Sequence, residues 1–387
     1  MESERQRKRQ RLPLPTKKRR VEPDVVDLSS GPDEPVVAKI PSRKDIAKML
    51  QKIEVSTSWK ESLQAIQQIQ NWLMDPPVRR YKSCAEMALD NVVVTTLVLD
   101  SFYCYGGMAR ILEFMSEYNK NWDCVVGVTS FIADMLSFRW GEKEKDRKIA
   151  NELAKMFFRC GGIDKCTFVV AFHQEFKSNP NPITADTKYV WMTMGRALNG
   201  EEAREMVSEE ADRFLVLQQA RICISGLVED KHGSNDSAAW ACDVLEAALY
   251  SIANIIKYTS VTKDMLEELD IARYCIQVLA ENDWIQNENV ATYALGVLFL
   301  CIQHKEVEIE LFEHLMSPLI YCMKHFSANV PVRSFVLILL ESACEKLPRE
   351  QIESSGVLEA ISALLKSEHS CKKTKDKVRD IMRKIIK

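Results

Sequence analysis

The 387-residue chain lacks the short motifs by which catalytic and metal sites are usually read from a sequence. It has no Gly-x-x-x-x-Gly-Lys loop, no Gly-x-Gly-x-x-Gly turn, no His-Glu-x-x-His helix and no Gly-x-Ser-x-Gly elbow. The nearest metal-like group, Cys160, Cys166 and His173, matches no common zinc spacing. We therefore expect a protein that is not an enzyme and that uses no cofactor and no metal.

Long apolar runs are also missing, and the strongest one, residues 91–105, is short and contains Asp100. It is too short to span a bilayer, so we expect no membrane segment. The charged N-terminus has no apolar core, so we expect no secretory leader. None of the 12 cysteines forms a Cys-x-x-Cys pair. Most lie on apolar helical faces, which is typical of reduced thiols in a nuclear or cytosolic setting; examples are Cys242, Cys275, Cys301, Cys322 and Cys344.

Residues 1–43 differ in kind from residues 44–387. The first segment is basic, then acidic, and holds six of the 13 prolines. It has too few large apolar residues to offset its ordering entropy, which predicts a disordered tail. Residues 44–365 carry 32 basic and 45 acidic side chains, a net charge of -13. Such a body repels phosphate backbones and favours basic protein segments, so nucleic-acid binding by it is not expected.

The longer segment repeats a pattern in which an apolar helical turn runs into glycine and then into an amphipathic helix. The pattern occurs around Gly107, Gly162 and Gly356, and Asp270 takes the place of the glycine in a fourth copy. A sharp reversal between two helices usually needs a residue that tolerates positive φ, and Asp is one of the few substitutes.

Each repeated turn is followed by a longer amphipathic helix. Such helices are expected to begin near Lys82, Trp122, Ala185, Ser237, Asn287, Val330 and Cys371. Ser317 before Pro318 predicts a further helix start, with serine as the cap and proline at the first position. Hairpin signals are absent, and the spacing of the long helices overlaps that of armadillo and HEAT units. The sequence thus predicts an all-α, right-handed α-α superhelix over residues 44–387.

Segments such as EQIESSGVLEAISALL resemble armadillo repeats, in which a short helix, a glycine turn, a second helix and a longer third helix stack as a solenoid. The resemblance implies that third helices line a groove for extended peptides. In the nuclear-import branch of that family, a Trp-x-x-x-Asn motif contacts the peptide. Tyr250 and Asn254 are its near match here and are the candidate groove residues. The alternative is that both are ordinary residues of a third helix.

The tail contains a basic cluster, Lys17, Lys18, Arg19 and Arg20, that is similar to a nuclear localisation signal. Basic side chains along an extended segment suit the acidic pockets of an import receptor. The alternative is a solvated basic arm that touches nucleic-acid phosphates without preference for sequence. We favour nuclear localisation, with shuttling to the cytoplasm left open.

A second tail segment resembles an interaction motif for the small ubiquitin-like modifier. It consists of Val25, Val26, Asp27 and Leu28, followed by serines and acids. The β-branched valines favour an extended chain that adds to a sheet edge, while the aliphatic side chains enter a hydrophobic groove.

The C-terminal residues 371–387 predict a helix that is basic on one side and apolar on the other, which is typical of a capping helix. A docking site for phosphate or for an acidic partner is the alternative. Taken together, the sequence predicts a nuclear armadillo-like scaffold that binds partner proteins through its groove. A nucleocytoplasmic transport adaptor and a chromatin- or RNA-associated regulator with basic termini remain the alternatives.

Overall fold

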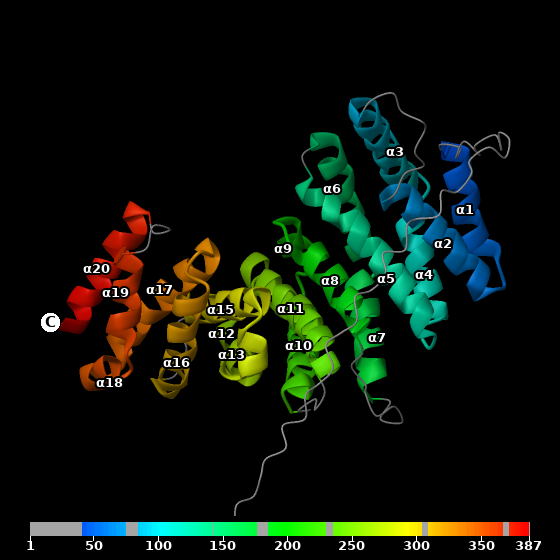
Figure 1. Cartoon of the computed structure of the whole chain (residues 1–387). Helices are drawn as coiled ribbons and strands as arrows, with labels where there is room; N and C mark the ends of the chain where they lie inside the picture. The colour runs from blue at the N-terminus through cyan, green and yellow to red at the C-terminus, as the bar shows by residue number, and fades with distance from the viewer. Residues whose placement is uncertain are drawn as a thin grey trace, which may run out of the picture. The chain divides into compact units, whose positions relative to one another are not determined.

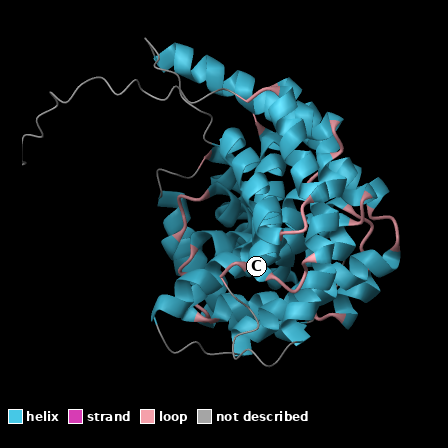
Figure 2. Cartoon of the chain, turned by 90° about the vertical axis from the view of Figure 1, so that its right-hand side faces the viewer, coloured by secondary structure: helices cyan, strands magenta, loops and turns pink. Residues whose placement is uncertain are grey.

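The computed structural model describes residues 41–74, 84–141, 143–175, 185–229, 235–303, 309–366 and 371–386. The chain divides into two units, Met1–Ala38 and Lys39–Lys387. The first unit lies outside the described residues, so the fold below is that of the second. All described elements are helices, joined by turns and loops (Figure 2). None of the described helices is both long and apolar enough to cross a membrane.

One series of helices forms a row in which each member contacts the next, and we call it the third row because its helices close each repeat (Figure 1). The third row consists of α2 (Trp59–Met74), α5 (Trp122–Ser137), α8 (Thr187–Leu198), α11 (Asn235–Tyr258), α15 (Glu288–Gln303), α17 (Val330–Lys346) and α20 (Lys372–Ile386). A parallel series of contacts links the second row. It consists of α1 (Arg43–Val55), α4 (Gly107–Glu117), α7 (Gly162–Glu175), α10 (Glu210–Glu229), α13 (Ile271–Ala280), α16 (Ile309–His325) and α19 (Val357–Lys366).

The remaining helices precede the glycine turns or fill connections. The first row consists of α3 (Cys84–Cys104), α6 (Glu144–Arg159), α9 (Glu202–Met206), α12 (Lys263–Glu268) and α18 (Arg349–Ser354). The short α14 (Asn282–Ile285) lies before α15, and the 3-10 helix η1 (Phe138–Trp140) follows α5. Neighbour-to-neighbour contacts along the rows are the pattern of a solenoid, in which each repeat buries its apolar face against the next.

The predicted turns have the backbone that their residues require. Gly106, Gly161 and Gly356 have φ of 64°, 67° and 81°, and Asp270 has φ of 51°. In the two Gly-Gly pairs the first glycine makes the turn. The second faces an aromatic ring: a Cβ at Gly162 would lie 2.5 Å from the Phe157 ring. The two glycines of a pair are therefore needed for different reasons.

Most predicted helix starts agree with the structure, and two expectations were wrong. The helix expected near Lys82 is α3 of the first row; the third-row helix of that region is α2, which begins at Trp59 and has no glycine turn before it. Pro318 lies inside α16 and does not start a helix. The buried side chains of Leu315, Met316 and Leu319 hold the helix on both sides of it, so packing overrides the local signal.

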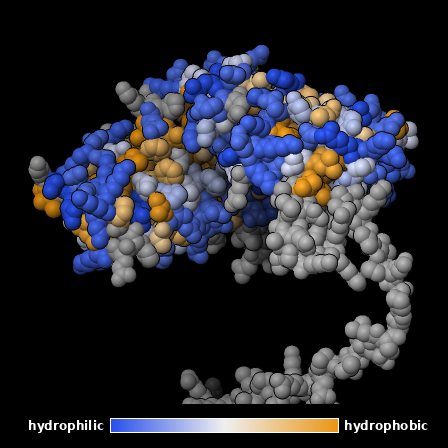
Figure 3. All heavy atoms as spheres, turned by 90° about the horizontal axis from the view of Figure 1, so that it is seen from above, coloured by the Kyte–Doolittle hydropathy of each residue, from blue (hydrophilic) through white to orange (hydrophobic). Residues whose placement is uncertain are grey.

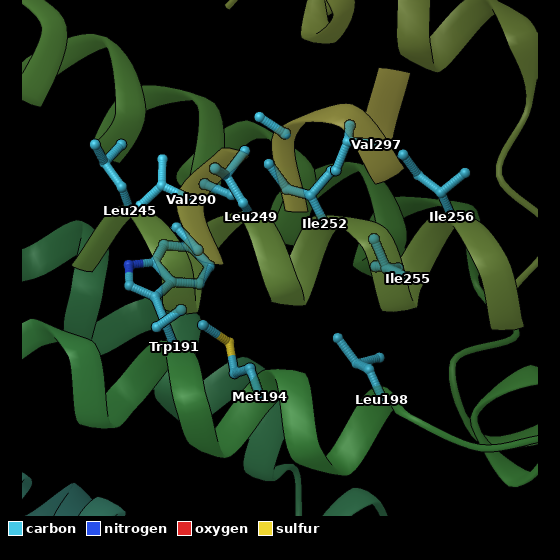
Figure 4. Packing of buried hydrophobic residues seen from close by; sticks show 14 of the residues in the cluster. Trp191, Met194, Leu198, Leu245, Leu249, Ile252, Ile255, Ile256, Val290 and Val297 are labelled. Carbon is cyan, nitrogen blue, oxygen red and sulfur yellow. The ribbon is translucent and has the colours of Figure 1, made fainter. Parts of the chain in front are cut away.

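The core runs continuously along the rows. The apolar stripe of α11, which includes Leu245, Leu249, Ile252 and Ile256, is buried, and Figure 4 shows it beside Val290 and Val297 of α15. The predicted cysteines on apolar faces are buried or half-buried free thiols. Burial raises the pKa of Cys301 to about 12, which keeps this thiol protonated.

Candidate functional site

The third row carries a pocket of about 400 Å³, which we call the α8–α11 pocket. It is lined by Ser137 of α5, Trp140 of η1, Lys188, Met192 and Arg196 of α8, Asp243, Glu246, Ala247 and Tyr250 of α11, and Tyr293 of α15. Residues from four consecutive third-row helices and from η1 thus meet at one place. The pocket exists because the helices are stacked in this order, since no single repeat could form it.

One wall of the pocket is fixed by a buried arginine. Arg139 is 7% exposed and donates from Nη1 to the carbonyl oxygens of Arg196 (2.8 Å) and Ala197 (2.9 Å). These carbonyls belong to the last turn of α8, where helical acceptors lack intrahelical partners. The guanidinium therefore caps α8 and pins η1 to it. Trp140, the next residue, is held beside the pocket with its side chain 49% exposed.

Two tyrosines also line the pocket. The rings of Tyr250 and Tyr293 pack edge to face, with centroids 5.3 Å apart. The Tyr250 hydroxyl accepts a hydrogen bond from Nδ2 of Asn199 at 2.7 Å, which sets the position of the ring. Burial raises the pKa of Tyr293, so its hydroxyl stays protonated at neutral pH. Aromatic walls of this kind offer apolar area together with hydroxyl groups.

Charges at the rim are only partly compensated. Lys188 Nζ lies 2.7 Å from Asp243 Oδ2, and the hydrogen bond from this pair raises the pKa of Lys188. Glu246 accepts from Asn289 Nδ2 at 3.2 Å. Burial raises the pKa of Glu246, and the Asn289 bond opposes that rise. A half-buried carboxylate gains most from a cation that reaches it.

Asn254, one of the two predicted groove residues, lies between helices. It is 6% exposed, and its Nδ2 donates to the Gly195 carbonyl oxygen of α8 at 2.9 Å. Ser251 makes a similar bond to the Trp191 carbonyl oxygen at 2.8 Å. Asn254 thus ties α11 to α8, whereas Tyr250 lines the pocket. Whether either residue binds a peptide stays a prediction.

Other predicted residues fall in different places. The tail clusters 17–20 and 25–28 lie outside the described residues. Within the part of the chain that the structure describes, no group of His, Cys, Asp and Glu is placed to hold a metal ion. The sequence reasoning missed Trp140, Lys188, Asp243, Glu246 and Tyr293. Trp140 carried a usable signal, because it is an aromatic residue in the polar segment FRWGEKE.

Comparisons with known proteins support the fold alone. No family model matches the sequence, and no curated protein matches it either. The crystal structure of Uso1-2 is similar over 88% of this chain and 50% of its own, with 9% identity and a TM-score of 0.52. The designed armadillo repeat protein YIII(Dq)4CqI is similar over 67% of this chain and 93% of its own, with 13% identity and a TM-score of 0.42.

UNC-45 from Drosophila melanogaster is similar over 89% of this chain and 62% of its own, with 10% identity and a TM-score of 0.33. Together with the three rows of helices, the similarity to Uso1-2 places the described region in the class of armadillo/HEAT-like helical solenoids. This confirms the predicted all-α fold.

Proposed function

We propose that this protein is a non-catalytic interaction scaffold that binds an extended, basic segment of a partner protein along its third row. The observation that carries the proposal is the α8–α11 pocket, where Trp140, the tyrosine pair and the half-buried Glu246 lie together. A lysine or arginine side chain would stack on an aromatic ring and approach the carboxylate. The acidic balance of residues 44–365 favours the same partners.

A displayed library of 16-residue segments from natural proteins, selected on the full chain, tests this proposal. We expect enrichment of basic segments without helical periodicity. Glu246→Gln removes the charge of the side chain and keeps its shape, so it should weaken the binding of such segments by about tenfold. Trp140→Ala should weaken their binding by a similar factor, because an aromatic anchor is lost.

Phe168→Ala is the matched control, because Phe168 is a 55% exposed aromatic residue on α7 of the second row and does not line the α8–α11 pocket. Binding that is unchanged in both pocket variants would contradict the proposal. Enrichment of acidic segments would contradict the charge assignment.

The transport-adaptor alternative receives less support than the scaffold. An adaptor of that kind presents asparagine side chains to its cargo, whereas the carboxamide of Asn254 is bonded to the Gly195 carbonyl oxygen. A regulator that used its basic C-terminal helix would present lysines to phosphates. Two of its lysines, Lys377 and Lys384, pair with Glu341 of α17.

We further propose that the tail directs nuclear import through Lys17, Lys18, Arg19 and Arg20. The compact basic cluster in an apolar-poor segment supports this proposal. Replacing the four residues with alanine should exclude a fluorescent fusion from the nucleus. Replacing Arg7, Lys8, Arg9 and Arg11 is the matched control, and it should have the smaller effect. Equal nuclear accumulation of the wild type and the first variant would remove the import proposal.

The segment Val25, Val26, Asp27 and Leu28 is proposed to bind the small ubiquitin-like modifier. Three aliphatic residues within an otherwise polar tail support this proposal. A tail peptide should shift the amide resonances that line the hydrophobic groove of the modifier. A peptide with Val26 and Leu28 replaced by alanine should not shift them, and absence of shifts with the native peptide would end this proposal.

A further inference from the structure

The α8–α11 pocket is richer in aromatic rings than two other pockets of the helical region. Its lining includes Trp140 of η1, Tyr250 of α11 and Tyr293 of α15. A pocket of about 290 Å³ between α1, α3 and α6 has no aromatic residue among its described lining residues. In a pocket of about 290 Å³ between α4 and α7, Phe168 is the one aromatic residue among them. The concentration of rings at the α8–α11 pocket indicates a ligand that aromatic faces attract.

The rings of this pocket are held by contacts within the protein. Tyr250 and Tyr293 pack edge to face, and the Tyr250 hydroxyl accepts from Asn199 Nδ2 at 2.7 Å. The Arg139 guanidinium, which caps α8, lies 5.7 Å from the centroid of the Trp140 ring. The Trp140 ring thus already contacts one cation. A lining that is ordered in advance loses little conformational entropy when a ligand binds.

The cations that line the pocket have partners in the protein. Lys188 Nζ pairs with Asp243 Oδ2 at 2.7 Å. Arg196 Nη1 lies 4.0 Å from Asp134 Oδ1 and donates to a carbonyl oxygen of α5 at 2.6 Å. Glu246 differs from Asp243, because its hydrogen-bond donor is the neutral carboxamide of an asparagine. Glu246 is therefore the carboxylate of the lining that gains most from a cation of the ligand.

The acceptors of the lining disfavour an unmodified ammonium group. The side chains of Asp243, Glu246 and Tyr250 each already accept a hydrogen bond within the protein. An unmodified lysine ammonium is strongly hydrated, and its three N–H donors would compete for these acceptors once water is displaced. Trimethylation keeps the positive charge, removes all three donors and adds apolar methyl groups. A quaternary ammonium group therefore suits this lining better than an unmodified ammonium group.

We propose that the α8–α11 pocket binds a trimethylated lysine of the partner segment in preference to an unmodified lysine. This inference rests on the proposed function and names the chemical form of the side chain that enters the pocket. Trp140, Tyr250 and Tyr293 contact the methyl groups, and Glu246 supplies the opposite charge.

A library of short peptides with varied flanking residues tests the inference on the full chain. Each peptide is made in three forms, whose central residue is lysine, trimethyl-lysine or the uncharged analogue in which carbon replaces the quaternary nitrogen. Fluorescence anisotropy measures the dissociation constants. We expect the trimethyl-lysine form to bind about tenfold more tightly than the lysine form. It should also bind more tightly than the uncharged analogue, because attraction to an aromatic face requires the positive charge.

Variants of the pocket separate the rings from the carboxylate. Trp140→Leu should bring the dissociation constants of the lysine and trimethyl-lysine forms together, whereas Trp140→Phe should retain part of the preference. Trp140 is 49% exposed, so circular dichroism should show unchanged helicity. Glu246→Gln should weaken both charged forms without reducing the preference, because the carboxylate attracts either cation. Phe168→Ala is the matched control and should change neither constant.

The outcomes distinguish this inference from the proposed function. Equal or tighter binding of the lysine form would overturn the inference and leave the proposed function standing. Equal binding of the uncharged analogue and the trimethyl-lysine form would also overturn it, because apolar contact alone would then explain the binding. If none of the three forms binds, the inference and the proposed function both fail.

Free choline carries the same trimethylammonium group without a peptide and tests the source of the ligand. It should compete with the trimethyl-lysine peptides only weakly, because it lacks the contacts of the flanking residues. Choline that binds as tightly as these peptides would overturn the assignment to lysine. A preference for trimethyl-lysine that persists undiminished in Trp140→Leu would overturn the assignment to this pocket.

Discussion

At the scale of the residue, each turn between the first and second rows matches two side-chain volumes. A large side chain before the turn is paired with a small residue after it, and a smaller one with a larger residue. Each turn has a buried apolar residue four positions before the positive-φ residue and a fitted residue directly after it. The four sets are Phe102, Gly106 and Gly107; Phe157, Gly161 and Gly162; Leu266, Asp270 and Ile271; and Ile352, Gly356 and Val357. A phenylalanine is paired with glycine, whereas leucine or isoleucine is paired with a β-branched residue. The total volume is thus kept nearly constant, as close packing requires.

This rule predicts that Gly162→Ala destabilises the fold by about 1–3 kcal/mol, because the added methyl group overlaps the Phe157 ring. The penalty should shrink in a Phe157→Leu background, where the smaller side chain leaves room. Urea unfolding followed by circular dichroism measures both effects as one double-mutant cycle.

Gly356→Ala is the control for this cycle. It has φ of 81° and nothing within 4 Å of the added Cβ, so its penalty comes from the backbone alone. That penalty should not depend on residue 157. Equal penalties for Gly162→Ala in the wild-type and Phe157→Leu backgrounds would show that the ring contact is not the cause.

At this scale the sequence predicts the structure correctly where the preference of a single residue type determines the backbone conformation. Positive φ at Asp270 could be predicted because few residue types adopt it. The prediction fails where a contact with another helix determines the position of the residue. Nothing local distinguishes an asparagine that faces a peptide from Asn254, which bonds to a carbonyl on α8. Pro318 likewise lies within a helix because buried neighbours hold it there.

At the scale of the element, adjacent third-row helices are tied by side chains that bond to backbone carbonyl oxygens. Thr193 of α8 donates to the Thr129 oxygen of α5 at 2.7 Å, and Arg196 donates to the Ala133 oxygen at 2.6 Å. Ser251 and Asn254 of α11 extend the same arrangement to α8. Such bonds fix the register between repeats, which apolar packing alone leaves less specific.

We predict that Asn254→Ala destabilises the fold by about 1–3 kcal/mol, because a buried carbonyl oxygen loses its donor. Asn289→Ala is the matched variant. It removes a bond between exposed Asn289 and Glu246 across the next pair of helices and should cost only a few tenths of a kcal/mol, roughly. The thermal midpoint of unfolding should be lower for Asn254→Ala than for Asn289→Ala. A lower midpoint for Asn289→Ala would contradict the prediction.

The C-terminal helix α20 shows why a basic helix can be structural. Its apolar residues Val378, Ile381 and Ile385 are buried, whereas Ile386 is 57% exposed. Lys377 and Lys384 pair with Glu341 of α17, and Lys384 also lies 2.8 Å from Glu345. The capping interpretation of this helix agrees with these contacts. The lysines on the side of α20 that contacts α17 therefore form ion pairs within the protein.

This arrangement predicts a pH dependence. Hydrogen bonds from Lys377 and Lys384 lower the pKa of Glu341 below its ordinary value of 4.5. Its contribution to stability is therefore present above that value and is lost as pH falls through the lowered pKa. Glu341→Gln should reduce the stability at neutral pH by up to about 1 kcal/mol. The difference from the wild type should vanish in acid.

The urea midpoints of wild type and Glu341→Gln across this range of pH test the prediction. Glu345→Gln is the control, because Glu345 is 62% exposed and meets only Lys384 among the ion pairs of the described residues. Its effect should be smaller at every pH. A wild-type advantage that grows on acidification would contradict a lowered pKa of Glu341.

At the scale of the whole helical region, the order of repeats determines what the third row presents. The face in Figure 3 is mainly hydrophilic, with separate hydrophobic clusters. The sequence predicted the class of fold because helical periodicity and turn residues are local properties that repeat. Of the residues that line the α8–α11 pocket, it predicted only Tyr250. Trp140, Glu246 and Tyr293 lie far apart in sequence and meet only after the helices stack, so no local pattern joins them.

The central claim is that a partner segment lies along the third row at the α8–α11 pocket. A photoreactive phenylalanine analogue in place of Trp140, Tyr293 or Val330 tests it most directly, with the cross-linked segments identified by mass spectrometry from cells. Trp140 and Tyr293 line the pocket, whereas Val330 is on the same row outside it. The account predicts that positions 140 and 293 capture the same basic segment and that position 330 does not capture it at the same residues. Unrelated segments at the two pocket positions, or equal capture at all three, would contradict the account.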